Sequence, residues 1–355
     1  MLRILEAHEM VGILALFLIV QFGGLLIAAF SFPPSQLVLL RSYQTLGSGG
    51  GAYVLYLVLF IIAAAAAMMV VFRLYKGMLL FRAFEAYAIG LPSLFLFLLL
   101  ISDFFPELNQ LSALAVSALL AAFLVIAKNR KPGLRNTATV ISSIGIGVII
   151  GLQGFYLAYL IMAVIALYDY IAVFVTKHMQ VMAKAMAERN LAFLIGSSDT
   201  EMVPGSSLTA KERAAIAKNI KPAAVRNPEV RAMMKKGAYP TVSQVALGAG
   251  DLALPLMLVV GAYISFAGFF IPVMAAVGAA FGLLLTMRLL QRYMAPLPAI
   301  PPLFASMSLF IGAALILSGL VAAITGLEFA ALFAFIMLAL ILTLKRNAVK
   351  ARQAP

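Results

Sequence analysis

Ten apolar runs of about membrane-spanning length limit this chain to a narrow set of folds. Hydrophobic residues make up 64% of its 355 residues and charged residues 11%, whereas about 25% of the residues in a soluble domain are charged. A run of about 20 apolar residues is the length that crosses a bilayer as one helix. The sequence therefore predicts an all-α polytopic membrane protein with short connections. The runs lie near residues 11–32, 51–72, 79–102, 110–127, 137–152, 155–176, 244–264, 266–287, 302–324 and 328–344.

The basic residues predict how these helices are oriented. Lys and Arg gather in the connections that follow the second, fourth, sixth, eighth and tenth runs, and the alternate connections contain almost none. Because cytoplasmic loops carry the excess of Lys and Arg, we expect both termini and the 177–240 connection to be cytoplasmic. The net charge of +13 is explained by this topology, and no nucleic acid partner is expected.

The polar stretch 177–240 interrupts the series of apolar runs. Its beginning, Met179–Asn190, is amphipathic and predicts a helix on the membrane surface. The expected organisation is residues 1–176 with helices one to six, 177–240 as a cytoplasmic loop with the surface helix, 241–324 with helices seven to nine, and 325–355 with a tenth helix and a basic cytoplasmic tail.

Two aspartates lie deep inside apolar runs, Asp169 in the sixth and Asp251 in the seventh. The other eleven acidic residues fall near or beyond the ends of the runs. A carboxylate at the centre of a membrane helix costs roughly 2.5–3.5 kcal/mol, so a chain that carries two is expected to use them. Either aspartate alone is more simply explained by hydrogen bonding between helices, or by a proton or cation site in a transporter. Polar packing between helices is also the simpler explanation for Gln21.

A carboxylate pair can hydrolyse a peptide bond without a metal. One ionised aspartate takes a proton from water, while the other, protonated, donates to the carbonyl oxygen. Gly248 and Gly250 carry no side chain, so substrate and water can approach Asp251, although glycines also serve simply to let membrane helices pack closely. Pro255 removes a backbone hydrogen bond and is expected to bend the seventh helix. The proline-rich run 296–302 is expected to be non-helical and to line a cavity.

Three short motifs occur in a fixed order at membrane depth. They are Tyr168-Asp169, Gly248-Ala249-Gly250-Asp251 and Pro298-Ala299-Ile300-Pro301. In this combination, over roughly residues 10–324, the chain resembles the presenilin and signal peptide peptidase family of intramembrane aspartyl proteases. The third motif of that family is usually Pro-Ala-Leu, and the isoleucine found here conserves the volume of the side chain.

The resemblance implies a presenilin-like helix bundle of nine core transmembrane helices, to which this chain adds a tenth. It implies that Asp169 and Asp251 are the catalytic pair. It further implies that Tyr168, Gly248 and Gly250 shape the site, and that Pro298, Ala299 and Ile300 contact substrate or support the active conformation.

The expected function is that of an intramembrane aspartyl endopeptidase. Its substrates would be transmembrane helices of single-pass proteins or signal peptides, cleaved within the lipid bilayer with no metal and no organic cofactor. The scissile segment must unwind, and strand edges near Leu191–Ile195 and Pro240–Val242 are candidates for pairing with it. An ion- or proton-coupled transporter is the alternative. The sequence leaves open whether the protein forms a homo-oligomer.

Overall fold

A computed structural model describes most of the chain. The described residues are 7–37, 79–128, 132–176, 194–204, 238–266, 268–293, 297–320 and 323–353, with four single positions between 56 and 67. Two compact units are present, a small one that contains residues 196–246 and a large one that contains the helices. Each unit is described by itself below.

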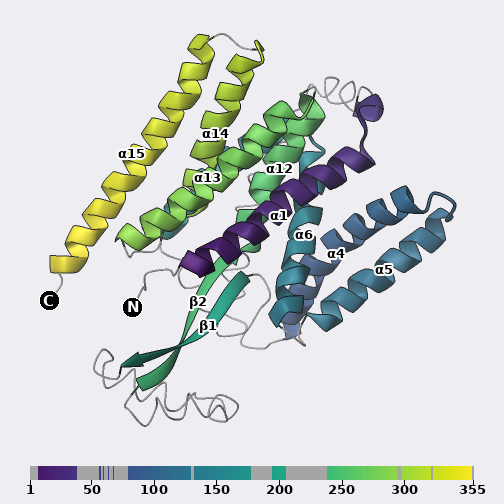
Figure 1. The fold of residues 1–355 in the computed structure, drawn as a ribbon, viewed down its shortest axis with the longest axis horizontal. Coiled ribbons are helices and arrows are strands. Elements are labelled where there is room, and N and C mark those ends of the chain that lie inside the picture. Colours follow the sequence, from purple (N-terminus) through teal and green to yellow (C-terminus); the bar gives the residue numbers. More distant parts are fainter. Residues whose placement is uncertain are drawn as a thin grey trace. The chain divides into compact units, whose positions relative to one another are not determined.

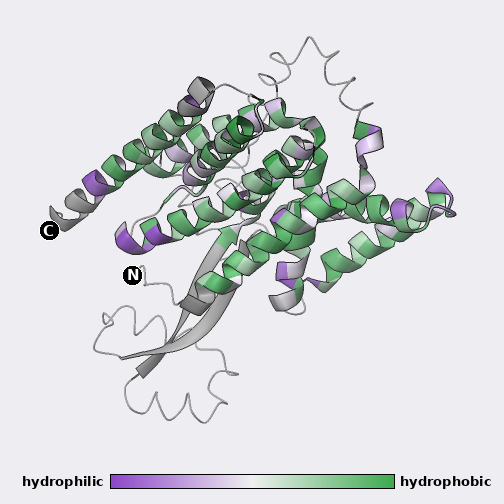
Figure 2. Ribbon diagram, turned by 45° about the horizontal axis from the view of Figure 1, so that its top comes forward, coloured by the Kyte–Doolittle hydropathy of each residue, from purple (hydrophilic) through white to green (hydrophobic). Residues whose placement is uncertain are grey.

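The large unit is built of apolar helices (Figures 1 and 2). Eight of those described are long and apolar enough to cross a membrane, and α12 is a shorter apolar helix. The predicted polytopic helical fold is therefore confirmed in the described part of the chain. The helices are α1 (Ala7–Ser31), α4 (Leu79–Phe104), α5 (Gln110–Ala127), α6 (Pro132–Gly151), α7 (Phe155–Phe174), α12 (Ala249–Ser265), α13 (Phe270–Tyr293), α14 (Ile300–Leu317) and α15 (Ala323–Gln353).

These nine helices correspond to nine of the ten predicted ones. The predicted second helix, near 51–72, lies outside the described residues except for four positions, all of them helical. The predicted surface helix Met179–Asn190 also lies outside them. The break between the fifth and sixth runs is confirmed at Gly154, whose φ of 93° is a backbone conformation that favours glycine.

Several helices start a few residues away from the predicted runs, and two of these starts lie at the motifs. The seventh predicted helix, α12, begins at Ala249 rather than near 244, because the Asp251 side chain caps it by accepting a hydrogen bond from the Gly248 amide. Two glycines close to this end also disfavour an earlier start. α14 begins at Ile300 rather than 302. The expectation that the proline-rich run 296–302 is non-helical is therefore wrong for its last three residues, because Pro301 and Pro302 belong to the first turn of the helix, where proline is tolerated.

α12 is the central helix of the large unit. It packs against α1, α6, α7 and α13, and most of its side chains, including Leu256 and Val260, are fully buried. Glycines on its neighbours make room for it. A Cβ on Gly147 would lie 2.7 Å from Leu256 Cγ, and one on Gly151 would lie 2.6 Å from Val260 Cβ. Small residues of this kind let membrane helices approach closely, and here they fix the position of α12.

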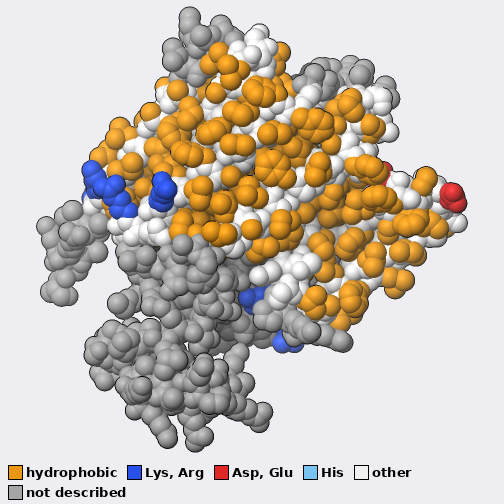
Figure 3. All heavy atoms as spheres, in the orientation of Figure 1, with side chains coloured by type: hydrophobic (Ala, Val, Ile, Leu, Met, Phe, Trp, Pro, Cys, Tyr) orange, Lys and Arg blue, Asp and Glu red, His pale blue; other side chains and the backbone are white. Residues whose placement is uncertain are grey.

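The outer face of the helices is apolar. Figure 3 shows hydrophobic side chains over most of the described surface, with Lys and Arg gathered toward the ends of helices. Leu111, for example, is 80% exposed and Phe123 is 67% exposed. A continuous exposed apolar surface of this size is the signature of a membrane-embedded protein.

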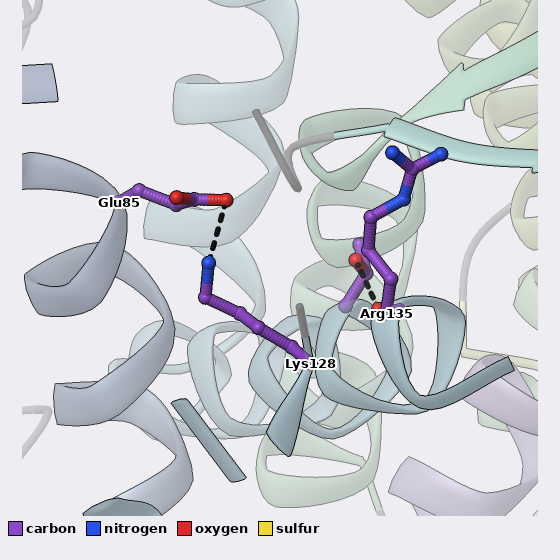
Figure 4. A network of polar contacts seen from close by, with 4 residues as sticks. Glu85, Lys128 and Arg135 are labelled. Carbon is purple, nitrogen blue, oxygen red and sulfur yellow. Dashed lines mark hydrogen bonds and ion pairs between the residues drawn. The ribbon is translucent and has the colours of Figure 1, made fainter. Parts of the chain in front are cut away.

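A buried ion pair joins α4 to the residue that follows α5. Lys128 Nζ lies 2.7 Å from Glu85 Oε1, and the two side chains are 2% and 5% exposed (Figure 4). The nearby Arg135, on α6, accepts a hydrogen bond at its backbone oxygen from the Thr139 hydroxyl, at 3.0 Å. The ion pair therefore joins the ends of α4 and α5.

The small unit contains a two-stranded sheet of β1 (Leu194–Pro204) and β2 (Ala238–Gly248). Of the segments expected to offer strand edges, residues 194–195 and 240–242 are extended in the structure. Residues 191–193 lie outside the described part. The strands are longer than the expected segments, and β2 continues directly into the N-terminus of α12.

Candidate active site

Asp169 is a buried carboxylate near the end of α7. Only 6% of the residue is exposed, so its oxygens need partners from the protein. Asp169 Oδ2 accepts a hydrogen bond of 3.1 Å from the Ile300 amide, and the Ala299 amide lies close enough to interact with this carboxyl group. The first and third sequence motifs therefore meet at one carboxylate.

The prolines of the third motif explain why these two amides face Asp169. A helix leaves its first backbone N–H groups without partners in the helix, and such N-termini bind anions. Pro298, Pro301 and Pro302 have no N–H to offer. Between them stand only Ala299 and Ile300, so the two amides at the start of α14 are the ones directed to the carboxylate.

Asp251 is the third residue of α12 and is partly exposed. Its Oδ2 accepts a hydrogen bond of 3.2 Å from the Gly248 amide. A Cβ on Gly248 would itself lie 3.2 Å from this Oδ2, which is a tight contact, so glycine at 248 lets the carboxylate fold back over the helix start.

Gly250 differs from Gly248 because it is exposed. A Cβ at this position would meet nothing within 4 Å in the described structure. The alternative that Gly250 serves close helix packing therefore finds no support, and open space lies beside Asp251. Neither glycine of the second motif lies against another helix, in contrast to Gly147 and Gly151.

The two aspartates lie close enough for their charges to interact. Tyr168, next to Asp169, is half-buried, and Pro298 and Ile300 are buried. The structure thus brings together Asp169, the amides of the third motif and, within electrostatic range, Asp251 with its glycine cap.

Two polar residues hold the first turn of α12 and were not predicted as site residues. Ser143 Oγ on α6 donates to the Ala249 oxygen at 3.3 Å, and Gln21 Nε2 on α1 donates to the Leu252 oxygen at 3.0 Å. Both side chains are fully buried. Gln21 was visible as an amide inside an apolar run, but Ser143 carries no such signal because serine is common in membrane helices.

The chain is similar to known proteins in sequence and in fold. A family model described as signal-peptide peptidase, presenilin aspartyl protease matches residues 14–308. No curated protein matches the chain. Among solved structures, that of a presenilin family intramembrane aspartate protease is similar with a TM-score of 0.52 at 18% identity, over 85% of this chain and 97% of that chain.

Proposed function

Since the chain belongs to the signal peptide peptidase and presenilin family of aspartyl proteases, we propose that Asp169 and Asp251 are its catalytic pair. The protein is an intramembrane aspartic protease. The proposal concerns which residues are catalytic and which substrates are cleaved. The observation that carries it is the convergence of the motifs. Asp169 accepts a hydrogen bond from the Ile300 amide at the start of α14 and interacts with Asp251 at the start of α12.

In the proposed mechanism the aspartate pair shares one proton. The ionised carboxylate takes a proton from a water molecule, whose oxygen attacks the scissile carbonyl carbon while the protonated carboxyl donates to the carbonyl oxygen. The tetrahedral intermediate then collapses as a proton passes to the leaving amine. The hydrogen bond from the Ile300 amide keeps Asp169 in one orientation throughout, so no reorganisation of this carboxylate is needed during the reaction.

The proposed substrates are transmembrane helices of single-pass proteins and signal peptides. The open space beside Gly250 leaves this side of the helix start uncovered for an approaching substrate, and the peptide bond is accessible only after the helix unwinds locally. We propose that the unwound segment adds to an edge of the β1–β2 sheet. Replacing Thr241 and Val242 of β2 with proline would then lower cleavage and leave the helical unit folded. Unchanged cleavage would exclude the pairing.

The assay is cleavage of a tagged single-pass helix by the purified protein in detergent. The wild type should release product. Asp169→Asn and Asp251→Asn should release none while remaining folded, and a hydroxyl-bearing transition-state mimic should block the wild type. Asp103→Asn is the matched control, since Asp103 bonds to Ser31 away from the pair and this variant should cleave normally.

The transporter alternative predicts a different result from the same preparation. It requires proton or ion flux into liposomes that depends on the two aspartates, with no product peptide from any helix. Normal cleavage by Asp251→Asn would also overturn the two-aspartate mechanism. The membership of the family favours proteolysis.

A further inference from the structure

α15 lies beyond the residues that the family model matches, yet it packs on the candidate active site. The match ends at residue 308, and α15 begins at Ala323. In Figure 1 the helix runs beside α14, and it contacts α14 and α13 directly. Phe329 near its beginning packs over Gly312 of α14, where a Cβ would lie 2.6 Å from the Phe329 Cβ.

One side-chain contact joins α15 to the residue next to Asp169. The hydroxyl oxygens of Tyr170 on α7 and Thr343 on α15 lie 2.6 Å apart. Thr343 Oγ1 also donates to the Ala339 oxygen of its own helix at 2.8 Å. Because the single proton of the Thr343 hydroxyl is used there, Tyr170 is the donor and Thr343 the acceptor in the bond between the helices.

A hydrophobic cluster extends this contact to the third motif. Its buried members are Leu289, Met337, Leu340 and Leu344, and the half-buried residues packed against it include Tyr170, Phe174 and Leu297. Leu297 directly precedes Pro298-Ala299-Ile300. The cluster therefore touches α7 one residue after Asp169, and touches the chain just before the two amides that face Asp169.

Through these contacts α15 packs next to both partners of the Asp169–Ile300 hydrogen bond, beside Asp169 at Tyr170 and beside the third motif at Leu297. A shift of α7 along its axis by one residue would move Asp169 by about 1.5 Å, which is enough to break a hydrogen bond of 3.1 Å. Tyr170 and Thr343 resist such a shift because a hydroxyl without a partner is unfavourable in a membrane interior.

We propose that α15 is a positioning element of the active site. Thr343, by accepting the Tyr170 hydroxyl, fixes the axial position of α7 and thereby the approach of Asp169 to the Ile300 amide. Thr343 and Tyr170 are positioning residues and do not touch the substrate. The inference rests on the proposed function of Asp169 and Asp251, and it deepens that function by adding a helix that the family match does not include.

The test compares variants of Thr343 in the full-length protein. Thr343→Val keeps the shape of the side chain and removes the hydroxyl that accepts from Tyr170. We expect kcat to fall about three- to fifteen-fold, the range that corresponds to the loss of one hydrogen bond between membrane helices. KM should change little, because substrate contacts are intact. Thr343→Ser should restore kcat, and Tyr170→Phe should match Thr343→Val. The double variant Tyr170→Phe/Thr343→Val should be no slower than either single one, since both remove the same bond.

A matched control separates positioning from stability. Thr286→Val removes a hydroxyl that donates within its own helix α13, to the Gly282 oxygen at 2.8 Å, and should leave kcat and KM unchanged. A wild-type kcat in Thr343→Val, under conditions where Asp251→Asn is inactive, would overturn the inference while the proposed function stands. Equal losses in Thr343→Ser and Thr343→Val would also overturn it, because the hydroxyl would then not matter.

A second readout does not depend on proteolysis. The chain has no cysteine, so Asp169→Cys/Asp251→Cys would contain its only two thiols. A membrane-permeant oxidant would join them as a disulfide, at a rate set by how often the two side chains approach each other. Adding Thr343→Val should slow this cross-linking, and adding Thr286→Val should not. If Asp251→Asn cleaved like the wild type, the proposed function would fail, and the cross-linking rate would still decide whether α15 positions α7.

Discussion

Breaking the ion pair between Glu85 and Lys128 should destabilise the protein more than any surface charge change. The two charged atoms lie 2.7 Å apart and the side chains are 2% and 5% exposed, so water cannot replace a lost partner. Removing one partner of a buried pair costs about 3–5 kcal/mol. For a chain of this length each kcal/mol lowers the unfolding temperature by about 2 °C, which predicts a fall of roughly 6–10 °C for Glu85→Met or Lys128→Met.

The double variant gives the sharper result. In Glu85→Met/Lys128→Met neither charge of the pair is left without the other and the volume is similar, so the unfolding temperature should return to within about 2 °C of the wild type. The assay is thermal unfolding in detergent followed by circular dichroism, with the exposed Glu107→Met as a control that should not shift. Additive losses in the double variant, or single variants that unfold like the wild type, would refute the reasoning.

Three further results are expected. Gly147→Ala should lower the free energy of unfolding by about 1–3 kcal/mol, because its Cβ would lie 2.7 Å from Leu256 Cγ and α12 would have to move; chemical unfolding in detergent measures this. Gly250→Ala should leave the unfolding temperature unchanged or raised and should still lower kcat/KM, because its methyl group would enter the open space beside Asp251. A single cysteine at Glu107 should react with an impermeant maleimide from outside the cell and one at Arg346 only after lysis; the reverse pattern would invert the proposed topology.

The helices could be predicted because their signal is local. Spanning length and hydrophobicity are properties of each run by itself, so the boundaries of α5 were predicted at 110–127 and observed at Gln110–Ala127. The start of α12 could not be predicted from hydrophobicity, because residues 245–247 are apolar like the helix that follows. It is fixed instead by the Gly248 amide on the Asp251 carboxylate.

The site was predictable as three motifs but not as an arrangement. Asp169 and Asp251 were conspicuous because charge is costly in a membrane. Nothing local in the sequence says that the amides of Ala299 and Ile300, rather than their side chains, would contact Asp169. The bond between Tyr170 and Thr343 was equally hidden, since hydroxyl groups are frequent in membrane helices and the two residues meet only after α15 has folded against α7.

The length of α12 bears on how water reaches a hydrolytic site inside lipid. Its 17 residues span about 25 Å, less than the hydrocarbon thickness of about 30 Å. A lipid-facing helix with this hydrophobic mismatch would thin the bilayer around it. α12 is enclosed by other helices, so the difference between its length and the hydrocarbon thickness lies inside the protein. There the polar backbone around Gly248 and the carboxylate of Asp251 stand where a further helical turn would otherwise be. With Asp251 as the proposed catalytic residue, the depth at which water must reach the site is set by where one buried helix begins.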